Sequence, residues 1–176
     1  MENKVKLAVV GLGQRGYSML STFCGIDEYE IVAVCDVYED RVNKASEYLV
    51  EKGKKEPTKY TDFEQLLKDK NVEAAYIASS WEEHINQTIR CMEVGIPVGM
   101  EVGGAYDIKD CWRLVKAYEK TNTPIMLMEN CCYDRFELLS TSLTRKGLLG
   151  DVYKTFCFTS VEVGEKRKWE TLSLVK

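Results

Sequence analysis

The amino-acid sequence predicts an α/β protein with a doubly wound parallel sheet, and three observations support this fold class. Short apolar runs rich in β-branched residues alternate with longer amphipathic stretches along most of the chain. The first apolar run ends in a glycine-rich turn that leads directly into a helical pattern, and the second ends in an aspartate. Strands that alternate with helices in this way are typical of a parallel sheet with helices on both faces.

The order of the elements follows from the period of the apolar residues and from residues that begin or end helices. Asp62 and Asp107 stand where side-chain caps would begin helices, and Gly53, Gly95 and Gly147 stand where helices would end. The expected strands cover residues 7–10, 29–37, 59–61, 72–79, 97–102, 124–128 and 151–159. The expected helices follow the glycine-rich turn and cover residues 38–52, 62–67, 83–93, 107–118 and 136–146.

The last third of the chain gives two further expectations. In the helix that begins after Asp107, the spacing predicts an inward apolar face, which consists of Ile108, Cys111, Trp112, Val115 and Tyr118. The tail at residues 164–176 has no convincing period, so no element is expected there.

The composition is that of a soluble globular protein. A chain of 176 residues with 45% hydrophobic and 30% charged residues supports one domain of ordinary size with a sizeable core. The net charge of −4 provides no basic surface, so neither nucleic acid nor a membrane is an expected partner. No apolar stretch approaches membrane-spanning length, and the charged first residues run straight into a strand, so no signal peptide is expected.

Cysteine usage indicates a cytoplasmic protein. The seven cysteines are odd in number and form no C-x-x-C pair, and most lie within apolar patterns. Buried, reduced thiols are therefore expected, and a zinc site is not.

The glycine-rich turn has the spacing G-x-G-x-x-G, with Gly11, Gly13 and Gly16 as its glycines. One glycine permits the tight turn, one lets backbone N–H groups approach a pyrophosphate, and one lets the helix pack closely on the strand. The pyrophosphate would lie at the helix N-terminus, where unpaired N–H groups and the helix dipole favour an anion. This pattern predicts a dinucleotide-binding Rossmann fold.

Asp36 supplies the second part of the dinucleotide pattern. It stands near the end of the second strand, and a carboxylate at this position accepts hydrogen bonds from both hydroxyls of the adenosine ribose and repels a 2′-phosphate. NAD is therefore the expected cofactor rather than NADP, although Arg41 lies close enough to complicate that preference. The alternative for Asp36 is a helix N-cap or a loop acid.

The strand ends together resemble a known family. The motifs are VVGLGQRG, VAVCDVYEDR, ASSWEEH, GMEVG and MLMENCCYDR, and they lie where strands would end. They resemble the glucose–fructose oxidoreductase / inositol dehydrogenase / MocA family of NAD(P)-dependent sugar enzymes, over roughly residues 4–155. The last motif, with the W-x-x-H and Glu-Val stretches, is similar to the branch of NAD-dependent glycosidases typified by α-N-acetylgalactosaminidases.

The resemblance implies a role for each matching position. Gln14 and Arg15 would lie by the pyrophosphate, and Asp36 would hold the adenosine ribose. Glu101 and Val102 would meet the nicotinamide ribose. Further residues would line the middle and nicotinamide side of the cofactor, namely Trp81, Glu82, Glu83, His84 and Asn130.

Each of these later positions also has a structural alternative. Trp81 would pack at a helix start, and His84, the single histidine, would be a partly buried polar residue. Glu82 and Glu83 would be solvated acids that suit the helix dipole, which is the favoured interpretation of their side chains. Asn130 would be a turn former. A glutamate such as Glu101, at the end of a buried strand, requires a partner, which favours a functional role.

The fifth strand exit departs from the family pattern. Many relatives have Glu-Lys-Pro there, with the lysine as a catalytic acid/base, whereas this chain has Glu101, Val102 and Gly103. A dehydrogenase that uses that lysine is therefore disfavoured, and no catalytic residue is assigned. The glycosidase branch also has valine after the glutamate, followed by proline, so Gly103 implies a less rigid bend.

The resemblance also implies the domain organisation. Residues 1–130 would form the Rossmann domain, and residues 131–176 would begin a truncated α/β substrate and oligomerisation domain. A sugar or glycoside is the implied small-molecule substrate. A homo-oligomer is compatible with the resemblance, although the family's usual interface is built largely on the substrate sheet.

Three functions remain open at this point. The glycosidase branch implies transient oxidation of a sugar hydroxyl by NAD, elimination of the glycosidic oxygen, addition of water and return of the hydride. The second is an ordinary NAD-dependent sugar or polyol dehydrogenase, which would accumulate NADH. The third is a non-catalytic fragment that only binds NAD.

Overall fold

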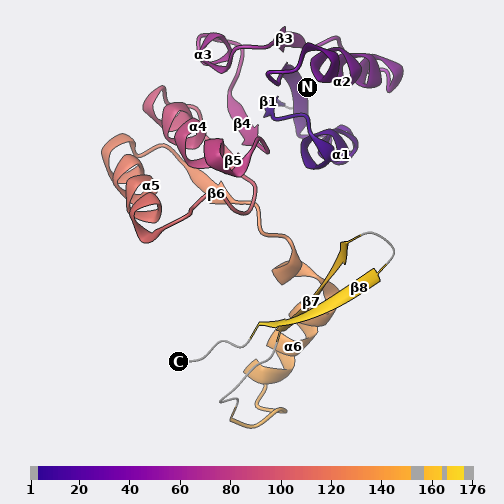
Figure 1. The fold of residues 1–176 in the computed structure, drawn as a ribbon, viewed down its shortest axis with the longest axis vertical. Coiled ribbons are helices and arrows are strands. Elements are labelled where there is room, and N and C mark those ends of the chain that lie inside the picture. The colour runs from indigo at the N-terminus through magenta and orange to yellow at the C-terminus, as the bar shows by residue number, and fades with distance from the viewer. Residues whose placement is uncertain (1–3, 152–156, 164–165, 173–176) are drawn as a thin grey trace. The chain divides into compact units, whose positions relative to one another are not determined.

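The computed structural model describes residues 4–151, 157–163 and 166–172. The chain divides into two compact units, residues 1–129 and residues 130–176, and each is described by itself (Figure 1).

The first unit is built on a six-stranded sheet in which every neighbouring pair is parallel. The strands are β1 (Val5–Val10), β2 (Tyr29–Cys35), β3 (Thr58–Tyr60), β4 (Ala74–Ile77), β5 (Val98–Met100) and β6 (Ile125–Leu127). Their order is β3-β2-β1-β4-β5-β6, so the chain starts in the middle, builds one edge, and returns to build the other. This order confirms the doubly wound sheet and makes β1 and β4 neighbours at the point where the winding reverses.

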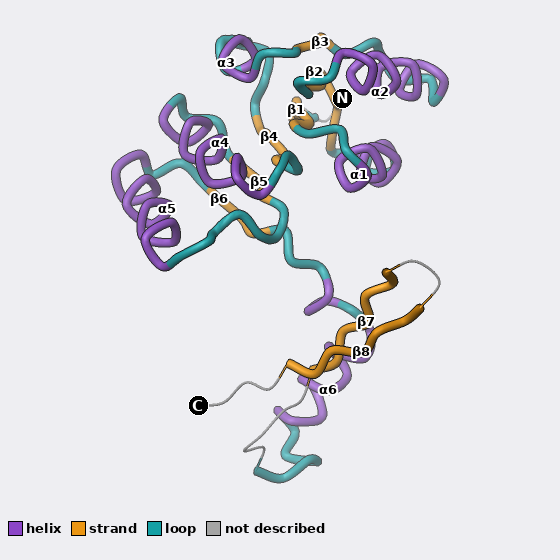
Figure 2. Tube along the Cα trace, in the orientation of Figure 1, coloured by secondary structure: helices purple, strands orange, loops and turns teal. Residues whose placement is uncertain are grey.

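Helices cover both faces of this sheet (Figure 2). They are α1 (Gln14–Cys24), α2 (Glu39–Glu51), α3 (Phe63–Leu66), α4 (Trp81–Glu93) and α5 (Ile108–Thr121). The predicted caps are present, because the Asp62 and Asp107 carboxylates accept backbone N–H groups at 2.9 and 3.0 Å. Helix α4 begins two residues earlier than predicted, at Trp81, with Ser80 as its N-cap.

The core consists of two apolar clusters, one on each face of the sheet. Since successive side chains of a strand point to opposite faces, Leu7 and Val9 join the cluster under α1 and α2, whereas Ala8 and Val10 join the cluster under α3 and α4. All four are nearly inaccessible to solvent. Apolar contact on both faces holds the strand ends in fixed positions, which is what a ligand site at those ends requires.

The prediction of which α5 residues face the core was wrong. Ile108, Trp112, Val115 and Tyr118 are exposed, and so is Cys111. The helix is apolar over more of its circumference than one packing face needs, and the side that packs against the core carries Leu114 instead. Periodicity alone did not distinguish these two adjacent stripes.

The expectation that the cysteines are buried holds for only some of them. Cys35 and Cys91 are buried, and burial raises the pKa of each thiol to about 12, so both are inert. Cys111, Cys131 and Cys132 are exposed, because α5 turns its packing face elsewhere and the other two lie in a short helix at the start of the second unit. Within the described part of the chain, no group of three or more His, Cys, Asp or Glu side chains is arranged to hold a metal ion.

The second unit begins with a short helix, η1 (Cys131–Tyr133), and continues into α6 (Arg135–Arg145). It ends in an antiparallel hairpin of β7 (Cys157–Val163) and β8 (Lys166–Leu172). The strand predicted for residues 151–159 overlaps β7, but its residues 152–156 lie outside the described residues. Strand β8 falls in the tail for which the sequence predicted no element.

Among the helices of the described residues, none combines the length and apolar character needed to cross a lipid bilayer.

Candidate functional site

The glycine turn joins β1, α1 and β4 through contacts that leave no room for a side chain. Gly11 directly follows β1 with φ +84°, and its N–H donates to the Cys35 carbonyl at 2.8 Å. A Cβ at Gly11 would overlap the backbone of Ser79 at the β4 exit, and a Cβ at Gly16 would overlap the Gly11 carbonyl oxygen. Glycine is therefore required at both positions for steric reasons, as the motif predicted.

The N-terminus of α1 is suited to an external anion. Gly13 is the N-cap residue and makes no side-chain cap hydrogen bond. The first turn, which begins Gln14-Arg15, contains no acidic residue, whereas the first turns of α2 to α6 each contain at least one. Backbone N–H groups without a carboxylate partner, beside the positive charge of Arg15, favour a bound pyrophosphate.

Asp36 lies just after β2 and braces the glycine turn. The residue is buried, with 8% exposed. One carboxylate oxygen, Oδ2, accepts the Leu12 N–H at 2.7 Å, and Oδ1 accepts the Tyr38 N–H at 3.0 Å. Helix α2 has Tyr38 as its N-cap, so Asp36 is not the helix cap that the alternative interpretation proposed.

Arg41 lies beside this carboxylate, as the sequence suggested. Its Nη1 is 3.6 Å from Asp36 Oδ2, and its guanidinium stacks 4.4 Å above the centre of the Tyr38 ring. The half-exposed guanidinium offsets part of the negative charge that would repel a 2′-phosphate, so the preference for NAD over NADP rests on the balance between Arg41 and Asp36.

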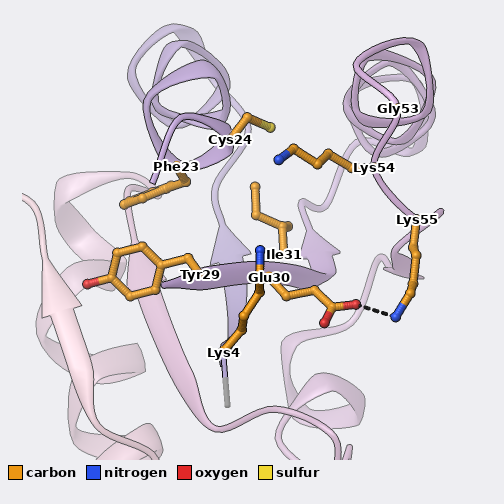
Figure 3. A pocket seen from close by; sticks show the side chains of 9 residues that line it. All are labelled: Lys4, Phe23, Cys24, Tyr29, Glu30, Ile31, Gly53, Lys54 and Lys55. Atoms are coloured by element: carbon orange, nitrogen blue, oxygen red, sulfur yellow. Dashed lines mark hydrogen bonds and ion pairs between the residues drawn. The ribbon is translucent and has the colours of Figure 1, made fainter. Parts of the chain in front are cut away.

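A cleft of about 450 Å³ runs along the ends of β1, β2 and β4. Its wall includes Gly11, Gly13, Asp36, Tyr38, Arg41, Phe63, Ser79, Ser80, Glu83 and Gln87. Ligands of doubly wound sheets bind in this position, outside the carboxyl ends of the strands. A separate hollow of about 270 Å³ lies near the start of β2 (Figure 3), where Lys55 pairs with Glu30 at 2.8 Å, and it is remote from those strand ends.

Glu101 follows β5 and is held by side chains from two other elements. Its carboxylate is buried, with 6% of the residue exposed. The Tyr76 hydroxyl, from β4, donates to Oε1 at 2.7 Å, and Arg15, from α1, places Nε and Nη2 at 2.8 Å from the same oxygen. The requirement for a partner, inferred from sequence, is therefore met by a network of three residues.

This network keeps Glu101 ionised. Burial acts to raise the pKa of the Glu101 carboxyl, but hydrogen bonds from Tyr76 and Arg15 outweigh burial and hold that pKa below its usual range. The same contact, added to burial, raises the pKa of the Tyr76 phenol, so Tyr76 remains a hydrogen-bond donor. The β5 exit thus presents a fixed negative charge.

His84 is buried in the first turn of α4, with 2% exposed. Its Nε2 lies 3.1 Å from the Ser79 carbonyl oxygen, and Nδ1 has no hydrogen-bond partner among the residues that the structure describes. Burial lowers the pKa of the imidazole, and its effect exceeds the opposing effect of nearby carbonyl groups. At neutral pH His84 is therefore an uncharged donor that fixes the β4 exit, which is close to the structural alternative for this residue.

Two glycines after Glu101 pack directly on the start of α4. Gly103 has φ +96° and Gly104 has φ +87°. A Cβ at Gly103 would lie 2.5 Å from the Trp81 indole, and a Cβ at Gly104 would lie 2.5 Å from His84 Cβ. Proline, which fixes φ near −65°, cannot adopt the Gly103 conformation, so the proline expected at this position from the family pattern does not fit the loop of this chain.

Of the remaining residues predicted to contact the cofactor, some are exposed and one lines the cleft. Trp81 is 58% exposed, and Val102 is also exposed beside the loop glycines. Glu83 lines the cleft, whereas Glu82 is fully exposed, and a hydrogen bond from its own backbone N–H lowers its pKa, as suits a first-turn acid. Asn130 is exposed and precedes η1 in the second unit.

Tyr76 is the site residue that the sequence analysis missed. It was assigned to a buried strand, and its ring does pack on Phe23, with 5.0 Å between the ring centres. The available signal was a hydroxyl inside an otherwise apolar strand, because a buried tyrosine hydroxyl requires a hydrogen-bond partner. The sequence did not indicate which partner it has.

The fold and the strand-end site define a dinucleotide-binding Rossmann domain. The model of the Gfo/Idh/MocA family, described as an oxidoreductase family with an NAD-binding Rossmann fold, matches residues 5–129. The chain belongs to this family, and NAD is the cofactor of its fold.

Two relatives of the chain have names that identify them as glycosidases. It is 37% identical over 152 residues to a glycosyl hydrolase family 109 protein of Saccharopolyspora erythraea, which covers 84% of this chain and 33% of the relative. It is 34% identical over 151 residues to an α-N-acetylgalactosaminidase of Bacteroides fragilis, which covers 84% and 36%. The chain thus spans about a third of the length of these relatives.

Solved structures share the fold. The scyllo-inositol dehydrogenase of Lactobacillus casei with bound NAD(H) and scyllo-inositol superposes with a TM-score of 0.81 at 19% identity, over 91% of this chain and 46% of that chain. The myo-inositol 2-dehydrogenase of Lactobacillus plantarum gives a TM-score of 0.76 at 21% identity, over 85% and 43%.

Proposed function

We propose that the chain is the NAD-binding part of a sugar-active enzyme, and that this enzyme is a glycosidase that uses NAD through transient oxidation and elimination. The observation that carries the proposal is the pair of buried, braced carboxylates, Asp36 and Glu101, at the β2 and β5 exits on either side of the glycine turn. Similarity to glycosyl hydrolase family 109 proteins supports the choice of glycosidase.

The residues present fit the cofactor. The α1 N-terminus would hold the pyrophosphate, and Asp36 would accept hydroxyls of the adenosine ribose with the acceptor capacity left by its two backbone contacts. Glu101 and Val102, with Trp81 and Glu83, would face the nicotinamide side. When bound, NAD would supply reversible acceptance of a hydride from a sugar carbon.

The absence of an ionisable side chain at Val102 favours the glycosidase over a lysine-dependent dehydrogenase. Glu101 is ionised and paired, and His84 is uncharged and buried, so neither is placed to exchange protons with a substrate. In this proposal the first unit binds and orients, and the acid/base groups of the reaction come from elsewhere in the whole protein.

Calorimetric titration of the full chain with NAD and with NADP tests the cofactor assignment. We expect NAD to bind more tightly than NADP, and Asp36→Ala to weaken NAD by about tenfold or more, since it removes a charged acceptor of two ribose hydroxyls. Arg41→Ala is the matched control, because it leaves the carboxylate in place and is expected to weaken NADP more than NAD. A folded chain that binds neither nucleotide would overturn the proposal.

A second assay separates the two enzyme classes. A preparation of the whole enzyme supplied with an aryl α-N-acetylgalactosaminide and NAD is expected to release the aryl group without net accumulation of NADH. Accumulation of NADH in proportion to product would instead establish a dehydrogenase.

A further inference from the structure

We infer that Tyr76 is a positioning residue for the nicotinamide half of NAD, because its hydroxyl and the Arg15 guanidinium fix one oxygen of Glu101 and leave the other to accept ribose hydroxyls. This inference rests on the proposed function, since it assumes that Glu101 faces the nicotinamide ribose.

The two oxygens of the Glu101 carboxylate have different surroundings. Oε1 accepts the Tyr76 hydroxyl at 2.7 Å and the Arg15 nitrogens at 2.8 Å. Oε2 has one hydrogen bond among the described residues, a long contact of 3.3 Å with the Val102 N–H. Because a carboxylate oxygen can accept two hydrogen bonds, Oε1 is saturated and Oε2 retains acceptor capacity.

The position of Tyr76 explains why this arrangement is rigid. The ring is 1% exposed and packs edge-on against Phe23 of α1, so the hydroxyl cannot follow a moving carboxylate. Arg15 is half-exposed and lies in the turn of α1 that would bind the pyrophosphate. Tyr76 is thus the fixed partner in the network, and Arg15 is the partner that a ligand can reach.

The charged and titratable groups that face Glu101 come from three elements. Arg15 approaches from α1 and Tyr76 from β4, and both favour the ionised carboxylate. His84 lies on α4 and is uncharged at neutral pH. Loss of the Tyr76 hydroxyl would therefore raise the pKa of Glu101, and the carboxylate would become protonated at a higher pH than in the native chain.

Tyr76→Phe in the full chain tests the inference, with NAD and ADP as ligands in calorimetric titrations. We expect NAD to bind about fivefold to tenfold more weakly, as for the loss of one charge-assisted hydrogen bond, and ADP to bind unchanged because it lacks the second ribose. As the pH is lowered, the NAD affinity of the variant should also begin to fall at a higher pH than that of the native chain, because Glu101 becomes protonated earlier. Tyr29→Phe is the matched control, since its ring packs on the same Phe23.

The outcomes distinguish the inference from the proposed function. If the native chain binds NAD, Glu101→Gln weakens that binding and Tyr76→Phe does not, the inference fails and the proposed function stands. Equal weakening of NAD and ADP by Tyr76→Phe would show a merely structural role and would also overturn the inference. A native chain that binds ADP but not NAD would overturn both.

A second variant covers the case in which Tyr76→Phe does not fold. Glu101→Asp shortens the carboxylate side chain and breaks the same hydrogen bond without altering the buried ring. Unchanged NAD binding by Glu101→Asp overturns the inference, because a carboxylate that need not be held in place does not depend on the Tyr76 hydroxyl.

Discussion

The two ends of the candidate site are built in different ways. In the glycine-turn region, formed by Gly11, Gly16 and Asp36, most contacts are made with backbone atoms. Two backbone N–H groups hold the Asp36 carboxylate, beside a longer contact with the Arg41 guanidinium, and backbone atoms leave no room for a Cβ at either glycine. In the β5-exit region, formed by Glu101 and the following glycines, the contacts are made with side chains from α1, β4 and α4.

This difference has a physical consequence. Backbone atoms are present whatever the sequence, so the glycine-turn region depends on a few small residues and one acid. The β5-exit region depends on several side chains that must be present together, so it can change by substitution while the fold stays the same. The comparison predicts that a bulky group is least tolerated in the glycine-turn region.

The largest effect is expected for Gly16→Ala. The new Cβ would overlap the Gly11 carbonyl oxygen, and since that oxygen belongs to packed backbone and Cβ is fixed to the helix backbone, α1 must shift away from β1. We expect the free energy of unfolding to fall by about 3 kcal/mol or more in urea denaturation, with loss of NAD binding. Gly25→Ala, at the other end of the same helix, has φ −85° and ordinary contacts of 3.5 Å, and should change stability little. Similar values for both variants would contradict the comparison.

A smaller effect is expected for Gly103→Ala. The residue has φ +96°, which costs about 1–2 kcal/mol for alanine, and its Cβ would also displace the Trp81 indole. Gly95→Ala is the matched control, because Gly95 has φ +78° but no described atom near the position of a new Cβ. The difference between the two losses of stability gives the cost of displacing the Trp81 indole. A change in tryptophan fluorescence should accompany Gly103→Ala but not Gly95→Ala. Equal losses would show that the indole moves without cost.

The smallest effect is expected for the pH dependence of stability. It arises from His84, which packs against Gly104 in the β5-exit region. Burial lowers the pKa of His84 in the folded chain, so the unfolded chain takes up the proton first as pH falls. The resulting contribution to stability is complete above about pH 6.5, the ordinary pKa of histidine, and is lost progressively below it.

The chain has a single histidine, so its imidazole signals can be assigned directly in an NMR titration. We expect a midpoint below the ordinary value, and we expect His84→Gln to remove the decline in stability just below pH 6.5. A midpoint at or above the ordinary value would show that the ring is not desolvated in solution.

Much of this architecture was predictable because it depends on local pattern. The apolar runs, the two aspartate caps and the glycine spacing each act over a few residues, and they define the parallel sheet and the turn at Gly11. The exclusion of a side chain at Gly16 follows from the same short segment, because the clashing atom is the Gly11 carbonyl oxygen, whereas at Gly11 it depends on the Ser79 backbone at the β4 exit. The broad apolar stripe of α5 misled the prediction because a helix pattern does not show which neighbour it meets.

The sequence alone determined the fold class, the cofactor class and the position of Asp36, because these depend on residues close together in the chain. Only the tertiary structure decided that Tyr76 and Arg15, 25 and 86 residues from Glu101, converge on one oxygen of its carboxylate. It also decided that His84 is buried and that Gly103 takes a conformation that proline cannot adopt. These features arise from distances between elements that packing sets, and no short-range pattern encodes them.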